Sequence, residues 1–230
     1  MKKIIFWTTL ISVVAFFIAA CAKKDDTATT VTAVTCDRTA SGSITIGSDT
    51  VSSSYLMYTG STPVTGCYAM TSTGFPPGTQ SIKQQRIVTS STSFVDYTGY
   101  FSDTACTSTS VISYQYQKYS SLSVGDQVTG LTTSGGRPSS AYKVTYKTDC
   151  ATAKGETDAG TELLNYNYSN TGVYLTTGTE KTFSTATNTT TYSIWGTADN
   201  GTALFFYSAD DSQTDYPSDW DNNNDTTYIK

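Results

Sequence analysis

The chain has 230 residues, no histidine, and 19 acidic residues against 14 basic ones. Without histidine, Ser-His-Asp and Cys-His catalytic arrangements are excluded, and the acidic balance gives no electrostatic footprint for nucleic acid. A chain of this length that is low in charge (14% of residues) and rich in tyrosine favours one domain of strands and turns.

The first 20 residues have the layout of a secretory signal peptide. Lys2 and Lys3 precede an uncharged run, Ile4–Ile18, which is shorter than the roughly 20 residues of a membrane span. The small residues Ala19 and Ala20 follow, and then Cys21. Removal of this segment leaves 12 basic residues and a net charge of −7.

The stretch "IAAC", which ends at Cys21, resembles the lipobox of bacterial lipoproteins. The resemblance implies cleavage before Cys21 and lipidation of that cysteine, and several acyl chains give a stable membrane anchor. Ala22, which stands where inner-membrane lipoproteins carry Asp, resembles the outer-membrane members of the family. We therefore expect an outer-membrane, cell-envelope location, and the alternative is an ordinary secretory signal cut after Ala20.

Three segments follow from this interpretation: a signal peptide (1–20), a lipidated cysteine with a polar tether (21–35), and an all-β domain (36–230). The domain holds four further cysteines, and an even count in an exported chain indicates two disulfides. Three pairings are open. Sequential pairing, Cys36 with Cys67 and Cys106 with Cys150, requires the least chain closure, and we favour it.

Alternating apolar and polar residues recur along the domain, with turn residues between the runs, as in antiparallel strands. Asn200-Gly201 predicts a tight hairpin turn, and "TTYIK" predicts a final short strand. The only helical candidate is "TDAGTELLNYN", whose second half we assign to a strand because of Tyr166 and Tyr168. The predicted strands are Ser43–Ile46, Ser54–Tyr58, Gly66–Met70, Ile82–Val88, Ser93–Phe101, Val111–Tyr119, Ala141–Cys150, Leu163–Tyr168, Thr190–Trp195 and Ala203–Tyr207.

This pattern predicts a single antiparallel meander, closed as a β-barrel or folded as a β-sandwich. The stretch Arg86–Gly125, with "YFSDTAC" between two alternating strands, and its continuation Ser139–Asp149 resemble lipocalin-like barrels. The resemblance implies a barrel whose interior or mouth holds a small apolar ligand. The inward candidates for such a site are Tyr114, Tyr116, Tyr142, Tyr146 and Trp195, or Ile194 beside it. The competing interpretation is that these aromatics only fill a core.

Two further hypotheses concern a calcium site and a glycoside hydrolase. Asp219, Asp221, Asn223 and Asp225 alternate like an oxygen-ligand calcium loop, but Asn224 and Lys230 replace the glycine and glutamate that an EF-hand requires. An irregular calcium site is the remaining metal hypothesis. Two carboxylates among Glu156, Asp158, Glu162 and Glu180 would suit a glycoside hydrolase, but all four stand in polar segments, and we favour the interpretation that they are solvated loop residues.

We therefore expect a non-catalytic protein without a cofactor, attached to the membrane by its N-terminal lipid. It would bind a small apolar or amphipathic ligand. The alternative is a structural or adhesin-type protein whose hydroxyl-rich and aromatic outer face contacts an envelope or surface partner. An accessible aromatic cavity favours the first hypothesis, whereas a filled core with an exposed aromatic patch favours the second.

Overall fold

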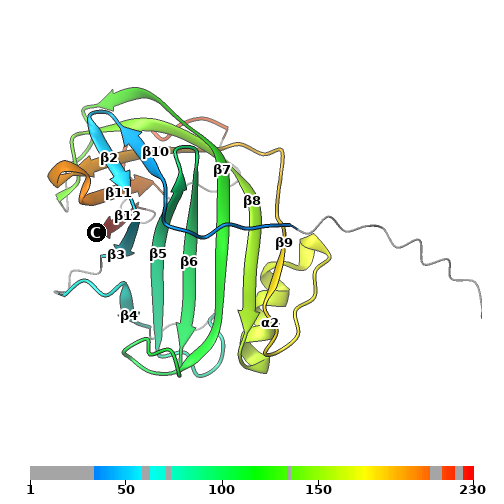
Figure 1. Cartoon of the computed structure of the whole chain (residues 1–230). Helices are drawn as coiled ribbons and strands as arrows, with labels where there is room; N and C mark the ends of the chain where they lie inside the picture. The colour runs from blue at the N-terminus through cyan, green and yellow to red at the C-terminus, as the bar shows by residue number, and fades with distance from the viewer. Residues whose placement is uncertain (1–33, 59–62, 71–73, 134–135, 208–213, 221–224) are drawn as a thin grey trace, which may run out of the picture. The chain divides into compact units, whose positions relative to one another are not determined.

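The computed structural model describes residues 34–58, 63–70, 74–133, 136–207, 214–220 and 225–230 (Figure 1). These residues form twelve strands, one α-helix and two 3₁₀ turns. The elements are β1 (Ser43–Ile46), β2 (Asp49–Ser52), β3 (Ser54–Met57), β4 (Cys67–Ala69), β5 (Ser81–Ser90), β6 (Ser93–Phe101), β7 (Val111–Thr129), β8 (Ser140–Gly155), α2 (Asp158–Asn167), η2 (Ser169–Thr171), β9 (Lys181–Ser184), β10 (Thr191–Ala198), η3 (Asp199–Gly201), β11 (Ala203–Tyr207) and β12 (Asp225–Ile229).

Eight of the strands close into an antiparallel barrel, which confirms the barrel prediction over the sandwich. The order around the wall is β3-β5-β6-β7-β8-β10-β11-β12, and the pairing of β12 with β3 completes the circle. Consecutive strands are neighbours from β5 to β8, as expected for a meander. Closure pairs the backbone groups that an open sheet would leave at its edges.

Strand β8 has two partners on the side away from β7. Its upper residues, Tyr142 to Tyr146, pair with β10 and close the barrel, whereas Cys150 to Ala153 pair with β9. The register of β7 against β8 shifts between Lys118 and Tyr119, which marks a bulge where the partner of β8 changes. The lower wall of the barrel therefore continues into a short additional strand.

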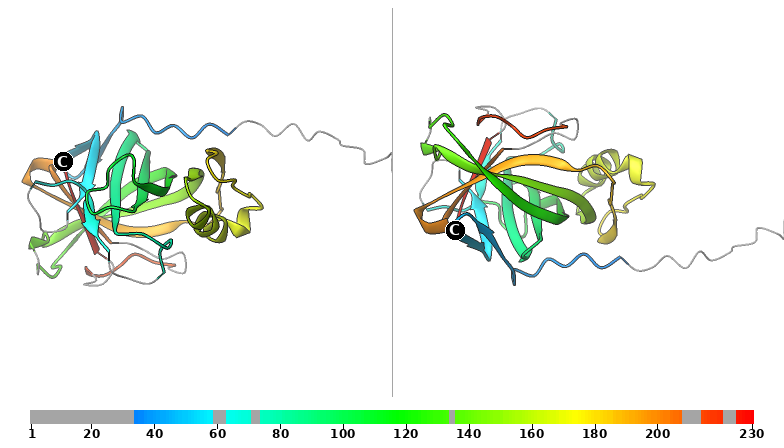
Figure 2. Two further views of the ribbon diagram at one scale, coloured as in Figure 1. Left: turned by 90° about the horizontal axis from the view of Figure 1, so that it is seen from below. Right: turned by 90° about the horizontal axis from the view of Figure 1, so that it is seen from above.

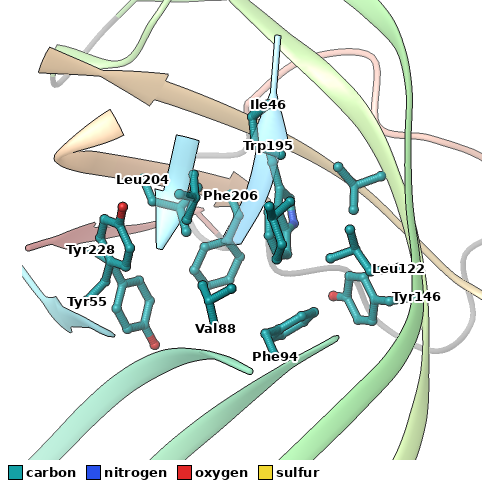
Figure 3. Packing of buried hydrophobic residues seen from close by; sticks show 13 residues of the cluster. Ile46, Tyr55, Val88, Phe94, Leu122, Tyr146, Trp195, Leu204, Phe206 and Tyr228 are labelled. Carbon is teal, nitrogen blue, oxygen red and sulfur yellow. The ribbon is translucent and has the colours of Figure 1, made fainter. Parts of the chain in front are cut away.

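A cluster of buried hydrophobic side chains fills the upper half of the barrel. The β1–β2 hairpin inserts Ile44, Ile46 and Val51 among side chains from the wall. Figure 3 shows the aromatic residues of this cluster converging from opposite sides of the barrel. Phe94 makes edge contacts with Tyr146 and Trp195, at ring-centroid distances of 5.2 and 5.1 Å. Such pairs contribute free energy to the core in addition to that gained by burying their apolar area.

One cation lies inside this core. Arg86 is only 2% exposed, and its Nε and Nη2 donate to the two carboxylate oxygens of Asp96, each at 2.7 Å. Its guanidinium group stacks against four rings, with the closest centroid, that of Phe206, at 3.7 Å. Burial alone would lower the pKa of Arg86, but the charge and hydrogen bonds of Asp96 outweigh burial and raise it. Arg86 is therefore charged, and Asp96 is the counter-ion that compensates its buried charge.

Helix α2 packs against the lower part of β8. Leu164 and Tyr168 contact Ala151 and Ala153, and Tyr168 meets Phe183 edge-on at 4.9 Å. The two views of Figure 2 place α2 on the side of the barrel away from β11 and β12. The strand predicted over Leu163–Tyr168 is therefore wrong. Thr157 caps the helix by accepting a hydrogen bond from the Gly160 N–H, and burial of Leu164 outweighs the strand preference of the tyrosines.

The four cysteines of the domain form two disulfides, but the pairing that we favoured is wrong. Cys36 is bonded to Cys150 and Cys67 to Cys106. The β4–β5–β6 pairing brings Cys67 close to the loop after β6, which carries Cys106. Sheet register, and not the shortest chain closure, therefore selects the partners.

Residues 34–42, which we call the strap, cross the outer face of the barrel between the Cys36–Cys150 disulfide and β1 (Figure 1). Arg38 lies over the ring of Tyr116, and the N–H of Gly42 donates to the Val88 carbonyl. The strap therefore runs from β8 over β7 to β5. The predicted hairpin of β10 and β11 is also confirmed, and Asn200 and Gly201 both have positive φ in its turn.

Candidate binding sites on and inside the barrel

The aromatic face of strand β7, which we expected to point into the barrel, points outward. Gln117 is in register with Asp96, whose carboxylate bonds Arg86 inside the barrel. Tyr116, the next residue in β7, therefore points outward, and it stands opposite Tyr97 on β6. Tyr114 shares this outer face. The expectation that Tyr114 and Tyr116 face the interior is therefore wrong, although the prediction that they share one face is confirmed.

Tyr114 and Tyr116 line a concavity of about 500 Å³ on the outer face of β5, β6 and β7, which we call the tyrosine groove. The strap and the residue before β9 contribute one charged side chain each. The groove residues used below are Arg38, Lys83, Gln85, Tyr97, Phe101, Tyr114, Tyr116 and Glu180.

The rings of the groove form a broad aromatic surface. The centroids of Tyr97 and Tyr116 are 4.8 Å apart with their planes tilted by 45°, and Tyr114 stands edge-on to Tyr116 at 5.9 Å. Gly99 lies beneath Tyr97. A Cβ on Gly99 would come within 2.3 Å of the Tyr97 hydroxyl and within 2.9 Å of the Phe101 ring. The missing side chain therefore lets the Tyr97 ring lie down against the strand.

The polar rim of the groove is held in place by Glu180. Its carboxylate accepts a hydrogen bond of 2.7 Å from the Tyr114 hydroxyl and pairs with Arg38 at 3.4 Å. Burial alone would raise the pKa of Glu180, but the Tyr114 hydrogen bond and the charge of Arg38 outweigh burial and lower it. Burial raises the pKa of Tyr97 to about 12. At neutral pH the groove thus holds a charged carboxylate and neutral tyrosines.

A second concavity, of about 190 Å³, lies inside the barrel below the packed core, and we call it the inner chamber. Its lining comes from opposite walls of the barrel, from β5, β6 and β7 on one side and from β11 and β12 on the other. The lining is mostly polar. The residues are Gln84, Asp96, Thr98, Gln115, Gln117, Tyr119, Phe206, Thr226 and Tyr228.

The remaining predicted ligand residues belong to the core of the barrel. Trp195 is fully buried and Tyr146 is 7% exposed, and both belong to the upper cluster. Ile194 is buried in a neighbouring cluster with Trp220. Tyr142 is half-buried and packs against the upper cluster beside Gly47. For these residues the structure shows the core-filling role that was the competing interpretation.

Of the four side chains predicted as calcium ligands, the structure describes that of Asp219. The Asp219 carboxylate accepts hydrogen bonds from the backbone N–H and hydroxyl of Thr132 and from the Trp220 N–H. These bonds, the Thr132 hydroxyl foremost, lower the pKa of Asp219, and they fasten its loop to the loop that contains Thr132. Asp221, Asn223 and the Asp225 side chain lie outside the described residues. Among the residues described, no three acidic or cysteine side chains gather as metal ligands.

The four carboxylates considered for glycoside hydrolysis do not form one site. Only Glu180 lines the tyrosine groove. Glu156 pairs with Lys154 at 2.6 Å, and Asp158 accepts a hydrogen bond from Thr177 beside α2. Glu162 makes no hydrogen bond or ion pair within the described chain.

Sequence reasoning missed Arg38, Lys83, Gln85, Tyr97 and Gly99 as groove residues. A glycine inside a strand between two tyrosines, "YTGY", signals a close approach to the backbone, and it could have pointed to the groove.

No family model matches the chain, and no curated protein matches it either. In the part of the chain that the structure describes, no helix has the length and apolar character of a membrane span.

Proposed function

We propose that the protein is a non-catalytic binding protein of the cell envelope, anchored through lipidated Cys21, that binds a saccharide chain in the tyrosine groove. One observation carries the proposal: the Tyr97 ring lies against Gly99, beside Tyr116, on an open outer face with hydrogen-bonding groups at its rim. The support for the anchor is the lipobox resemblance at "IAAC".

A saccharide fits this chemistry because a pyranose ring is amphipathic. Its C–H face is apolar and packs on aromatic rings, whereas its hydroxyl groups lie around the edge and both donate and accept hydrogen bonds. Tyr97 offers an aromatic face, and the Tyr116 ring beside it is covered on one face by the guanidinium group of Arg38. Arg38 and Gln85 supply donors at the rim, and Glu180 supplies an acceptor.

The charge state of the groove supports binding rather than hydrolysis. A glycosidase requires two carboxyl groups that flank the bond, one of them with a raised pKa so that it can donate a proton. In the described part of the chain, a single carboxylate lines the groove, that of Glu180, and its pKa is lowered. Glu180 is therefore suited to accept hydrogen bonds from hydroxyl groups.

The outer position of the groove favours the second of the two sequence hypotheses, that of a protein whose outer face contacts a partner. A filled upper core, with half-buried aromatic rings lining a groove on the outer face, suits a protein that contacts a partner on that face. The partner in this proposal is an envelope or surface polysaccharide. An adhesin-type role would use the same groove to bind a polymer of another cell.

The test is binding of the full-length chain, purified in mild detergent, to a glycan array and then to the best glycan by calorimetry. Tyr97→Ala and Tyr116→Ala should each weaken binding by about tenfold or more, equivalent to about 1.4 kcal/mol. Tyr166→Ala is the matched control, since Tyr166 is 80% exposed on α2, away from the groove. Absence of binding to any glycan, or equal binding by Tyr97→Ala and the control, would overturn the proposal.

A further inference from the structure

We infer that the inner chamber is a second and separate binding site, which takes a small uncharged polyhydroxy molecule the size of a single sugar ring. This site does not depend on the groove. The inner chamber and the tyrosine groove lie on opposite faces of β5 to β7, and the two sets of lining residues do not overlap.

The first support is that the polar groups of the inner chamber have unused hydrogen-bonding capacity. In the described chain the side chains of Gln84, Thr98 and Thr226 make no hydrogen bond, and neither do the hydroxyls of Tyr119 and Tyr228. Tyr228 is only 4% exposed. Gln84, Thr98, Tyr119 and Thr226 are half-buried, so their polar groups are free to donate to or accept from a polar occupant of the chamber.

The second support is the charge of the inner chamber. Among the lining residues that the structure describes, Asp96 alone is acidic, and Arg86 neutralises it through two hydrogen bonds. None of the described lining residues carries a positive charge. A charged ligand would therefore be buried without a counter-ion, at a large cost in free energy, whereas a neutral ligand would not.

The third support is the mixture of chemical types and the size. Gln115 accepts a hydrogen bond from the Tyr168 hydroxyl through Oε1, which leaves its amide N–H groups as donors. Gln117 donates through Nε2 to the Lys118 and Cys150 carbonyls and to Thr185, which leaves its Oε1 as an acceptor. The Phe206 ring gives an apolar face. A volume of about 190 Å³ gives room for a small molecule of the size of one sugar ring.

The test uses the full-length chain in mild detergent and measures the shift in its melting temperature with D-glucose, D-galactose, N-acetylglucosamine, myo-inositol and glycerol, each at millimolar concentration. We expect at least one of these to raise the melting temperature. Glucuronate, the charged counterpart of glucose, should produce no shift. Calorimetry with the best compound then gives the dissociation constant.

Two neighbouring glutamines provide a matched pair of variants. Gln84→Leu and Thr98→Val should each weaken binding of the small compound at least tenfold. Gln85→Leu, one residue along β5 and facing the groove, should leave it unchanged. Circular dichroism checks that each variant is folded. If a variant does not fold, native mass spectrometry of the wild-type chain should still show the bound compound as added mass that is lost on denaturation.

The inference is overturned if none of the compounds shifts the melting temperature, if glucuronate binds as well as glucose, or if Gln84→Leu retains full affinity. It is also overturned if Gln84→Leu and Thr98→Val raise the melting temperature and leave binding of the compound unchanged. The chamber would then hold only water. Loss of glycan binding in Tyr97→Ala is a separate result, which bears on the groove and not on the inner chamber.

Discussion

The pair of Arg86 and Asp96 allows a quantitative test of how the barrel core is built. Replacement of Asp96 by Asn keeps the shape of the side chain but removes its charge, and it leaves a guanidinium group that is 2% exposed without a counter-ion. Breaking a buried ion pair from one side destabilises a protein by about 3–5 kcal/mol. Because the Asp96 side chain is 24% exposed, water can screen part of the loss, and we expect the lower value, about 3 kcal/mol.

That loss should lower the melting temperature by about 6–12 °C, since 1 kcal/mol corresponds to about 2–4 °C in a domain of this size. The assay is urea unfolding at pH 7 without reductant, followed by circular dichroism, with a thermal melt alongside. Asp126→Asn is the control, because Asp126 is exposed and makes no ion pair or hydrogen bond in the described chain. It should change stability by less than about 0.5 kcal/mol.

The double variant Arg86→Met with Asp96→Leu distinguishes loss of the pair from loss of one partner. Replacing both charges by apolar side chains of similar size is often neutral or stabilising. We therefore expect the double variant to be more stable than Asp96→Asn alone. A loss below about 1 kcal/mol in Asp96→Asn, or a double variant as unstable as the single one, would refute the reasoning.

Four further predictions concern the cysteines and the tyrosines. Peptide mapping without reductant should show Cys36 joined to Cys150 and Cys67 to Cys106, and a Cys36–Cys67 peptide would contradict the fold. Each bridge constrains a long loop, so removing Cys67–Cys106, which spans 39 residues, should destabilise the domain by up to about 4 kcal/mol in urea unfolding. Tyrosines such as Tyr97, with a pKa of about 12, and Tyr168, whose pKa is also raised, have folded-state pKa values above the unfolded value of about 10. Their stabilising contribution is complete below about pH 10 and is lost as pH rises further, so a stability that stays flat to pH 12 would contradict the burial of these side chains. Replacement of Cys21 by Ser should leave an uncleaved, unlipidated precursor on intact-mass analysis, and normal processing of the variant would exclude the lipobox interpretation.

The sequence predicts the wall of this barrel well because period-two alternation is a local signal. The boundaries of β1, β6 and β11 agree with the predicted strands, and the order from β5 to β8 follows the chain. The same signal does not predict which face of each strand points into the barrel. Alternation defines two faces but does not say which one is inside, and we assigned the aromatic face of β7 to the interior.

That assignment failed because the lower interior is polar. Gln115 and Gln117 face the inner chamber, while Tyr114 and Tyr116 build the groove on the outside. The groove also depends on residues far apart in sequence, such as Arg38 and Glu180, which are brought together by the strap and by the chain before β9. Neither local pattern nor composition contains that information, and the same is true of the disulfide pairing.

The change of partner along β8 has a consequence for association between molecules. Below Tyr146, β10 no longer covers β8, and β9 takes its place over Cys150 to Ala153. Without β9, this stretch of β8 would be an exposed strand edge, which is a template for pairing with another chain. β9 is only four residues long and begins with Lys181, and both features disfavour the addition of a further strand. This small strand thus guards the barrel against edge-to-edge aggregation.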